Sequence, residues 1–208
     1  MIELFSTAFM TFLVVIDPPG CAPIFASLTS GATRIHRRLM ALRSVLIAWC
    51  ILVFFAMLGE PLLRTLGIDL ASFRIAGGVM LFLIALEMVF ERRTERREQR
   101  ANDIQGTPDA IDVSVFPMAI PMIAGPGSIA SIMLLCARSS GPQETAVVLS
   151  AMTAVIVLTL LSLLAAGPLM AFIGARLEAM ITRILGVILA ALAAQFIVDG
   201  IKQSFAGL

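Results

Sequence analysis

Asp17-Pro18-Pro19-Gly20-Cys21-Ala22-Pro23 interrupts a run of apolar residues that could otherwise enter a lipid bilayer as one continuous helix. A second stretch, Ala124-Gly125-Pro126-Gly127-Ser128, interrupts a later apolar segment. Pro126-Gly127 lies 107 residues after Pro19-Gly20. Paired breaks at matching places in two halves of a membrane protein are typical of a transport site at the interface between repeats.

The composition excludes a soluble domain. Hydrophobic residues make up 59% of the chain and charged residues 14%, with a mean hydropathy of +0.99, whereas soluble domains are about half apolar and about a quarter charged. We therefore expect an all-α, polytopic membrane protein. Apolar segments of roughly 20 residues or more predict six spans, the first and fourth broken: 3–30, 39–59, 68–90, 113–137, 145–170 and 179–201.

The whole chain, 1–208, is predicted to form a single membrane domain. Its longest polar segment, 91–112, is too short for a second domain, and its mixed charges with Gly106 and Pro108 predict a solvated loop. This loop separates repeat one, about 1–90, from repeat two, about 113–208. No Lys or Arg precedes the first apolar run and no cleavage pattern follows it, so the first segment is expected to remain in the mature protein.

The 107-residue offset extends beyond the breaks, since Gly59-Glu60-Pro61 aligns with Ala166-Gly167-Pro168. Three spans in each half is an odd number, so the second copy must cross the membrane in the opposite sense. An inverted repeat of this kind permits alternating access to a central site. The alternative is that duplication only built a stable bundle, in which small residues favour close helix packing: Gly77, Gly78, Gly186, Ala190, Ala191 and Ala194.

The distribution of positive charge predicts that both termini lie on the periplasmic side. With that orientation, eleven of the fifteen Lys and Arg residues face the cytoplasm and four face outside. The arginines between 91 and 100 alternate with glutamates, so no nucleic-acid partner is expected. The four outside are Arg64, Arg74, Arg138 and Lys202.

The two breaks differ in charge. Asp17-Pro18 is typical of a helix start, with an N-cap carboxylate followed by proline at the first helical position. The position equivalent to Asp17 at the second break is Ala124, so the half-helix that begins there has free amide donors and an uncompensated positive dipole end. Glycines around it let a ligand approach the backbone. The second break therefore favours an anion.

An acidic break beside an anion-seeking break predicts a zwitterionic ligand. Its carboxylate would lie on the amides of residues 127–129, and its ammonium group near Asp17. The small lining residues favour a small neutral amino acid. The residues expected to bind it are Asp17, Pro18, Gly20, Cys21, Pro23, Gly125, Pro126, Gly127, Ser128 and Ile129.

Two acids are candidates for proton coupling. Asp17 serves either as a cap or as a coupling group, and Glu87, late in the third span, either extends toward Arg92 and Arg93 or belongs to a proton relay. No metal or cofactor is expected, because the chain has one histidine and three cysteines without a CxxC pair. Three further charged residues at span ends are expected to be interfacial anchors: Asp69, Arg138 and Asp199.

Over essentially its whole length the chain resembles the MarC family of bacterial inner-membrane proteins, which is related to the LysE-type exporters. The family's first motif, Asp-Pro-x-Gly-Asn-x-Pro-Ile-Phe, is matched except at Cys21, where asparagine is frequent. This departure removes a side-chain hydrogen bond near the site and bears on substrate preference. The matching residues are Asp17, Pro18, Gly20, Pro23, Ile24 and Phe25, then Pro117, Ala119, Pro121, Ala124, Gly125, Pro126 and Gly127 of Pro-x-Ala-x-Pro-x-x-Ala-Gly-Pro-Gly.

The resemblance implies secondary transport of small neutral amino acids such as glycine, alanine or serine, coupled to protons, across the inner membrane. It does not imply antibiotic resistance. The resemblance fixes neither import or export nor an oligomeric state, although a homo-oligomer is compatible with it. A passive channel is a further alternative to a transporter.

A rival interpretation is a thiol–disulfide relay, since the six-span CcdA family has one cysteine in the first span and one in the fourth, as Cys21 and Cys136 do here. However, Ser128 is the repeat equivalent of Cys21, and Cys136 lies about 12 Å further along a helix. Disulfide geometry needs Cα atoms within about 7 Å. Transport is therefore favoured over the relay, and no motif of an intramembrane protease is present.

Overall fold

The computed structural model of the chain describes residues 1–90, 99 and 112–206, and across them it contains helices and no strand. Within these residues the expectation of an all-α, polytopic protein is confirmed. The elements are α1 Ile2–Ile16, α2 Pro18–Leu28, α3 Arg34–Thr65, α4 Leu70–Val89, η2 Ser114–Ile123, α6 Pro126–Ala137, α7 Pro142–Leu164 and α8 Ala166–Ala206.

Five segments among the described residues are long and apolar enough to cross a membrane, and α1 with α2 counts as one of them. A sixth is obtained if η2 and α6, which meet at an angle of 53°, form one broken span. The predicted fifth span, 145–170, was too long, because α7 ends at Leu164 and α8 begins at Ala166. Pro168 lies in the first turn of α8, where a missing N–H costs nothing. The predicted loop lies outside the described residues, except for Gln99 and Asp112.

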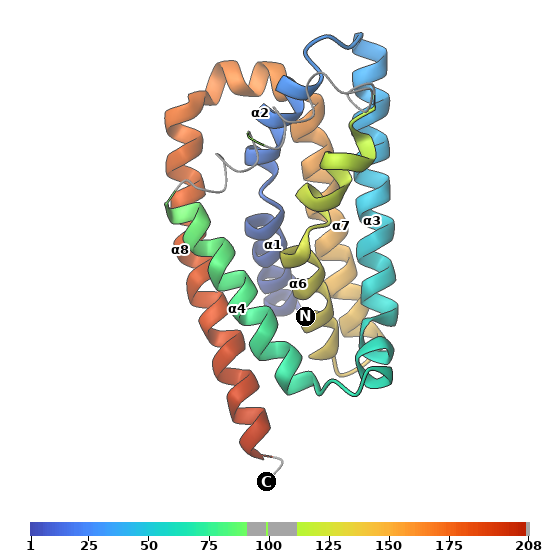
Figure 1. Cartoon of the computed structure of the whole chain (residues 1–208), viewed down its shortest axis with the longest axis vertical. Coiled ribbons are helices and arrows are strands. Elements are labelled where there is room, and N and C mark those ends of the chain that lie inside the picture. The colour runs from blue at the N-terminus through green and yellow to red at the C-terminus, as the bar shows by residue number, and fades with distance from the viewer. Residues whose placement is uncertain (91–98, 100–111, 207–208) are drawn as a thin grey trace.

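Successive helices run in alternating directions (Figure 1). In the view of Figure 1, α1 rises, α3 descends and α4 rises, whereas η2 with α6 descends, α7 rises and α8 descends. The first part of α8 lies across the top of the bundle before the helix turns downward. From η2 onward, each segment therefore runs opposite to its counterpart in the first half: η2 with α6 opposite to α1, α7 opposite to α3, and α8 opposite to α4. The chain starts and ends toward the lower end of the bundle.

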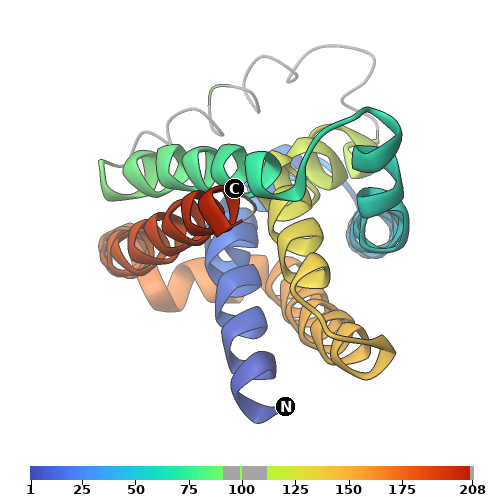
Figure 2. The same ribbon diagram turned by 90° about the horizontal axis from the view of Figure 1, so that it is seen from below.

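Helices α4 and α8 lie side by side and antiparallel in both overall views (Figures 1 and 2). A Cβ atom on Gly78 would lie 2.9 Å from the carbonyl oxygen of Ala193, and one on Gly186 would lie 3.1 Å from that of Ala85. The two contacts are related by an offset of 108 residues on each helix. Glycine thus allows close backbone approach at both places, as predicted for these small residues.

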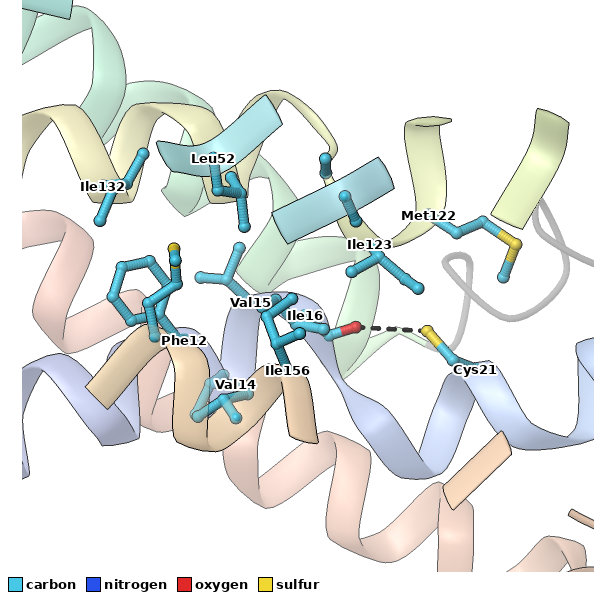
Figure 3. Packing of buried hydrophobic residues seen from close by; sticks show 14 of the residues in the cluster. Phe12, Val14, Val15, Ile16, Cys21, Leu52, Met122, Ile123, Ile132 and Ile156 are labelled. Atoms are coloured by element: carbon cyan, nitrogen blue, oxygen red, sulfur yellow. Dashed lines mark hydrogen bonds between the residues drawn. The ribbon is translucent and has the colours of Figure 1, made fainter. Parts of the chain in front are cut away.

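The broken first span is more enclosed than the other four long helical segments. In its most apolar stretch of 18 residues, 72% of the residues are buried, compared with 28% to 39% in the corresponding stretches of the other four segments. Val15 and Ile16, just before the first break, and Ile123 and Ile132, on either side of the second, belong to one cluster of buried apolar side chains (Figure 3). Both interruptions therefore lie at the centre of the packed core.

The start of η2 is tied to α3 by Asp112. Its carboxylate accepts a hydrogen bond from the Ser114 amide at 3.0 Å and forms an ion pair with Arg43 at 3.1 Å. Hydrogen bonding by Ser114, together with the charge of Arg43, lowers the pKa of this exposed carboxyl below its ordinary value. The beginning of the second half is thereby anchored at the upper end of the bundle.

Candidate functional site

The first break consists of one residue, Asp17, in a left-handed conformation (φ 59°, ψ 67°). Its amide still donates to the Leu13 carbonyl at 3.0 Å and so closes α1. Its carboxylate accepts a hydrogen bond from the Gly20 amide at 3.2 Å and so caps α2. The predicted cap is confirmed. Asp17 is 2% exposed, so the carboxylate lies within the core.

Gly20 and Cys21 complete the first turn of α2. A Cβ atom on Gly20 would lie 2.2 Å from Oδ2 of Asp17, so glycine is what allows the carboxylate to fold over the helix start. The Cys21 thiol is buried and donates to the carbonyl oxygen of Ile16 at 3.5 Å (Figure 3). Pro18 is buried and Pro23 is half-buried. The thiol thus satisfies a carbonyl that the break releases.

The second break precedes α6, which begins at Pro126 after the N-cap residue Gly125 and has no side-chain cap, as predicted. The Ile129 amide donates to the Gly125 carbonyl at 3.0 Å, which is the first hydrogen bond within the helix. Three amides, those of residues 127–129, were expected to bind a carboxylate. The Ile129 amide is used in this bond, so only those of Gly127 and Ser128 precede the first bond of the helix. The hydroxyl of Ser128 donates to the Ile123 carbonyl at 2.8 Å.

The same side-chain hydrogen bond closes both breaks. Cys21 bonds to the carbonyl five residues before it, Ile16, and Ser128 bonds to the carbonyl five residues before it, Ile123. The two donor residues are 107 residues apart, and so are the two acceptor residues, which is the offset that the sequence predicts. The two breaks are therefore equivalent in local hydrogen bonding, although only the first contains an acid.

The second break packs against residues that lie close to the first break and in α4. A Cβ atom on Gly127 would lie 3.1 Å from Cγ1 of Val15 in α1 and 2.5 Å from Cδ1 of Ile84 in α4. Gly127, at the second break, thus packs against the turn of α1 that precedes the first break. However, apolar side chains fill the space over Gly127 in this arrangement, so a ligand can reach these amides only if α4 or α1 moves.

Two cavities lie elsewhere in the bundle. One, of about 280 Å³, lies between α1 and α8 and is lined mainly by apolar atoms, and Ser6, Thr7 and Thr11 are among its lining residues. The other, of about 530 Å³, lies among α3, α6 and α7 and is lined by Glu60, Arg64 and Cys136 among others. Neither of these cavities lies between the breaks.

The remaining predicted residues are scattered. Glu87 is partly buried near the end of α4, and the arginines expected to attract it, Arg92 and Arg93, lie outside the described residues. Cys21 and Cys136 do not form a disulfide, and Cys136 lines a cavity that Cys21 does not line. Across the described ranges, no group of three His, Cys, Asp or Glu side chains is arranged to hold a metal ion.

Sequence reasoning missed the irregular backbone that leads to the second break. Within η2, Phe116 and Ile120 adopt extended conformations, and each precedes a proline through a cis peptide bond. The span 113–137 was predicted to be broken at residues 124–128, and the structure adds these two extended residues ahead of that break. Pro117 and Pro121, four residues apart, were the available signal, because proline removes helix donors and disfavours helix at the preceding residue.

Ser128 offers a test of this local structure. Ser128→Ala should lower the free energy of unfolding by about 1 kcal/mol or more, because the buried Ile123 carbonyl loses its partner. Ser131→Ala, one turn further along α6, is the matched control, since the Ser131 hydroxyl is buried without a hydrogen-bond partner among the described residues. Chemical unfolding of both variants in detergent micelles measures the difference. Equal losses would contradict the assigned role of Ser128.

Alternating antiparallel helices, with two spans broken at the centre, define a polytopic α-helical membrane protein. The MarC family of integral membrane proteins matches residues 2–205, and the chain belongs to this family.

Relatives align with the chain from end to end. They include a membrane protein of Methanocaldococcus jannaschii, 35% identical over 97% of both chains, and YvbG of Bacillus subtilis, 32% identical over 95% of this chain and 93% of that one. The inner membrane protein YhgN of Escherichia coli is 30% identical over the full length of both. No solved structure is a significant match. The chain is thus a multi-pass inner-membrane protein.

Proposed function

We propose that this protein is a secondary active transporter that moves small neutral amino acids, of the glycine, alanine and serine type, by alternating access. The observation that carries the proposal is the packing of Gly127, at the second break, against Val15, two residues before the first break, at the centre of the bundle. One break presents the buried carboxylate of Asp17, and the other presents the uncapped amino end of α6. A zwitterion has a group for each break: an ammonium group for the Asp17 carboxylate and a carboxylate for the α6 amides.

The proposed substrate site combines side-chain and backbone groups. The carboxylate of the amino acid binds the amides of Gly127 and Ser128, helped by the positive end of the α6 dipole. The ammonium group binds near Asp17. Because Val15 and Ile84 cover Gly127, we propose that the described arrangement is closed at the breaks and that withdrawal of α4 opens them.

An inverted repeat supplies the two arrangements that alternating access requires. Three observations support the repeat: the opposite directions of matching segments, the equivalent hydrogen bonds of Cys21 and Ser128, and the reciprocal packing of Gly78 and Gly186. We further propose that both termini face the periplasm, since that orientation leaves most Lys and Arg residues in the cytoplasm.

Counterflow in proteoliposomes tests the proposal. Vesicles loaded with unlabelled glycine or alanine should take up the same labelled amino acid far above protein-free vesicles, and uptake should exceed the external concentration when a pH gradient is imposed. Cys136→Ala should transport normally, because its thiol lines a cavity away from the breaks. Absence of counterflow for all twenty amino acids would contradict the proposal. Uptake that never exceeds equilibrium would instead indicate a channel, and loss of activity in Cys136→Ala a thiol relay.

A further inference from the structure

Arg74 is a buried arginine in the first turns of α4. It is 9% exposed, and its Nε atom has no hydrogen-bond partner among the described residues. Burying a charged group without a hydrogen-bonded partner is costly, and such a group normally faces an anion or a polar ligand. The Nε atom of Arg74 is therefore a buried donor that is available to an oxygen atom of a ligand.

The charges that act on Arg74 are those of Arg138, at the end of α6, and Asp199, in α8. Asp199 cannot neutralise both arginines, because it carries one negative charge against their two positive charges, and each of its oxygens already has a partner. Oδ2 forms an ion pair with Arg138, and Oδ1 accepts a hydrogen bond from Gln195 at 2.7 Å. The cluster of Arg74, Arg138 and Asp199 thus carries one surplus positive charge.

The geometry of Arg138 also favours recognition of a planar anion. Its guanidinium carbon lies 4.7 Å from the centroid of the Phe196 ring, which holds the group in place. Arg138 and Asp199 are 31% and 26% exposed, so ligands can reach the cluster from solution. Arg138 and Asp199 were expected to be interfacial anchors. That expectation did not include their electrostatic interaction with the buried Arg74.

The cluster joins the two halves of the chain at the lower end of the bundle. Helix α4 starts there, and α6 and α8 end there (Figures 1 and 2). This is the end at which the chain starts, which the proposed orientation places in the periplasm. A ligand held at this cluster would lie at the opposite end of α6 from the second break.

We propose that Arg74 and Arg138 form a binding site for a carboxylate, which receives the carboxylate of the amino-acid substrate at the periplasmic mouth. The guanidinium fork matches the two oxygens of a carboxylate, and Asp199 competes for Arg138 when the ligand is absent. The identity of the ligand as a substrate rests on the proposed transport function, whereas the carboxylate site itself does not.

Calorimetric titration of the full-length protein in phosphatidylcholine nanodiscs tests the site with sodium acetate as the probe. Arg74→Gln should weaken acetate binding roughly ten- to a hundredfold, as expected for loss of a charged hydrogen bond. Asp199→Asn should strengthen binding, because the competing carboxylate is gone, and a gain of affinity cannot result from misfolding. Arg64→Gln is the matched control at the same end, since Arg64 is 80% exposed and paired with Glu60, and it should bind acetate normally.

Several results would overturn the site: acetate affinity unchanged in Arg74→Gln, or weakened in Asp199→Asn. Chloride or phosphate bound as tightly as acetate would exclude a carboxylate site. Loss of acetate binding in phosphatidylglycerol nanodiscs would assign the site to a lipid headgroup instead. If acetate binds through Arg74 but no amino acid shows counterflow, the site stands and the transport proposal fails. If counterflow is found but Arg74→Gln binds acetate as tightly as the unchanged protein, the transport proposal stands and this site fails.

Discussion

Gly125→Ala should lower the free energy of unfolding by roughly 1–3 kcal/mol and abolish substrate counterflow. A Cβ atom at this position would lie 2.3 Å from the carbonyl oxygen of Pro121. That oxygen belongs to the backbone and cannot rotate away, so the chain between η2 and α6 must shift. The second break would then lose the geometry that aims the α6 amides. Chemical unfolding in detergent micelles, followed by counterflow in vesicles, measures both effects.

Gly141→Ala is the matched control. Gly141 is likewise the N-cap of a helix that begins with proline, Pro142, but nothing lies within 4 Å of a Cβ atom there. Any intrinsic cost of alanine at an N-cap is therefore common to both variants. If Gly125→Ala and Gly141→Ala lose equal stability, the close approach of Pro121 to Gly125 is not what requires glycine at the second break.

Asp17→Asn should abolish accumulation driven by a pH gradient while leaving counterflow partly intact. Asparagine also caps helices, so it can still accept the hydrogen bond from the Gly20 amide, but it carries no titratable proton. If one proton crosses with each substrate, a gradient of about one pH unit supports about tenfold accumulation, and the variant should show none. Labelled glycine uptake, with and without the gradient, measures the ratio.

Asp69→Asn controls for the loss of an aspartate at a helix start. Asp69 is the N-cap of α4, but it is exposed and makes no side-chain cap hydrogen bond. This variant should therefore accumulate glycine normally. Retention of gradient-driven accumulation by Asp17→Asn would exclude Asp17 as the coupling group and leave Glu87, tested by Glu87→Gln, as the remaining candidate.

The accuracy of the sequence-based predictions follows from how local each feature is. The cap by Asp17 and the uncapped start of α6 were predicted correctly, because capping depends on a few consecutive residues. The end of α7 was misplaced, because apolar composition continues through Leu164 into α8 and does not mark a helix boundary. The extended residues of η2 were missed because the apolar content of that segment outweighed its two prolines.

The sequence by itself determined the membrane class, the positions of both breaks and the spacing between them, since apolar content, proline and capping act over a few turns of chain. Only the tertiary structure decided what surrounds each break. It placed Val15 and Ile84 against Gly127, it packed Gly200 of α8 against Ala71 and Ile75 of α4, on either side of Arg74, and it paired Arg138 with Asp199. These contacts link residues far apart in the chain, and they depend on how antiparallel helices pack, which no local pattern encodes.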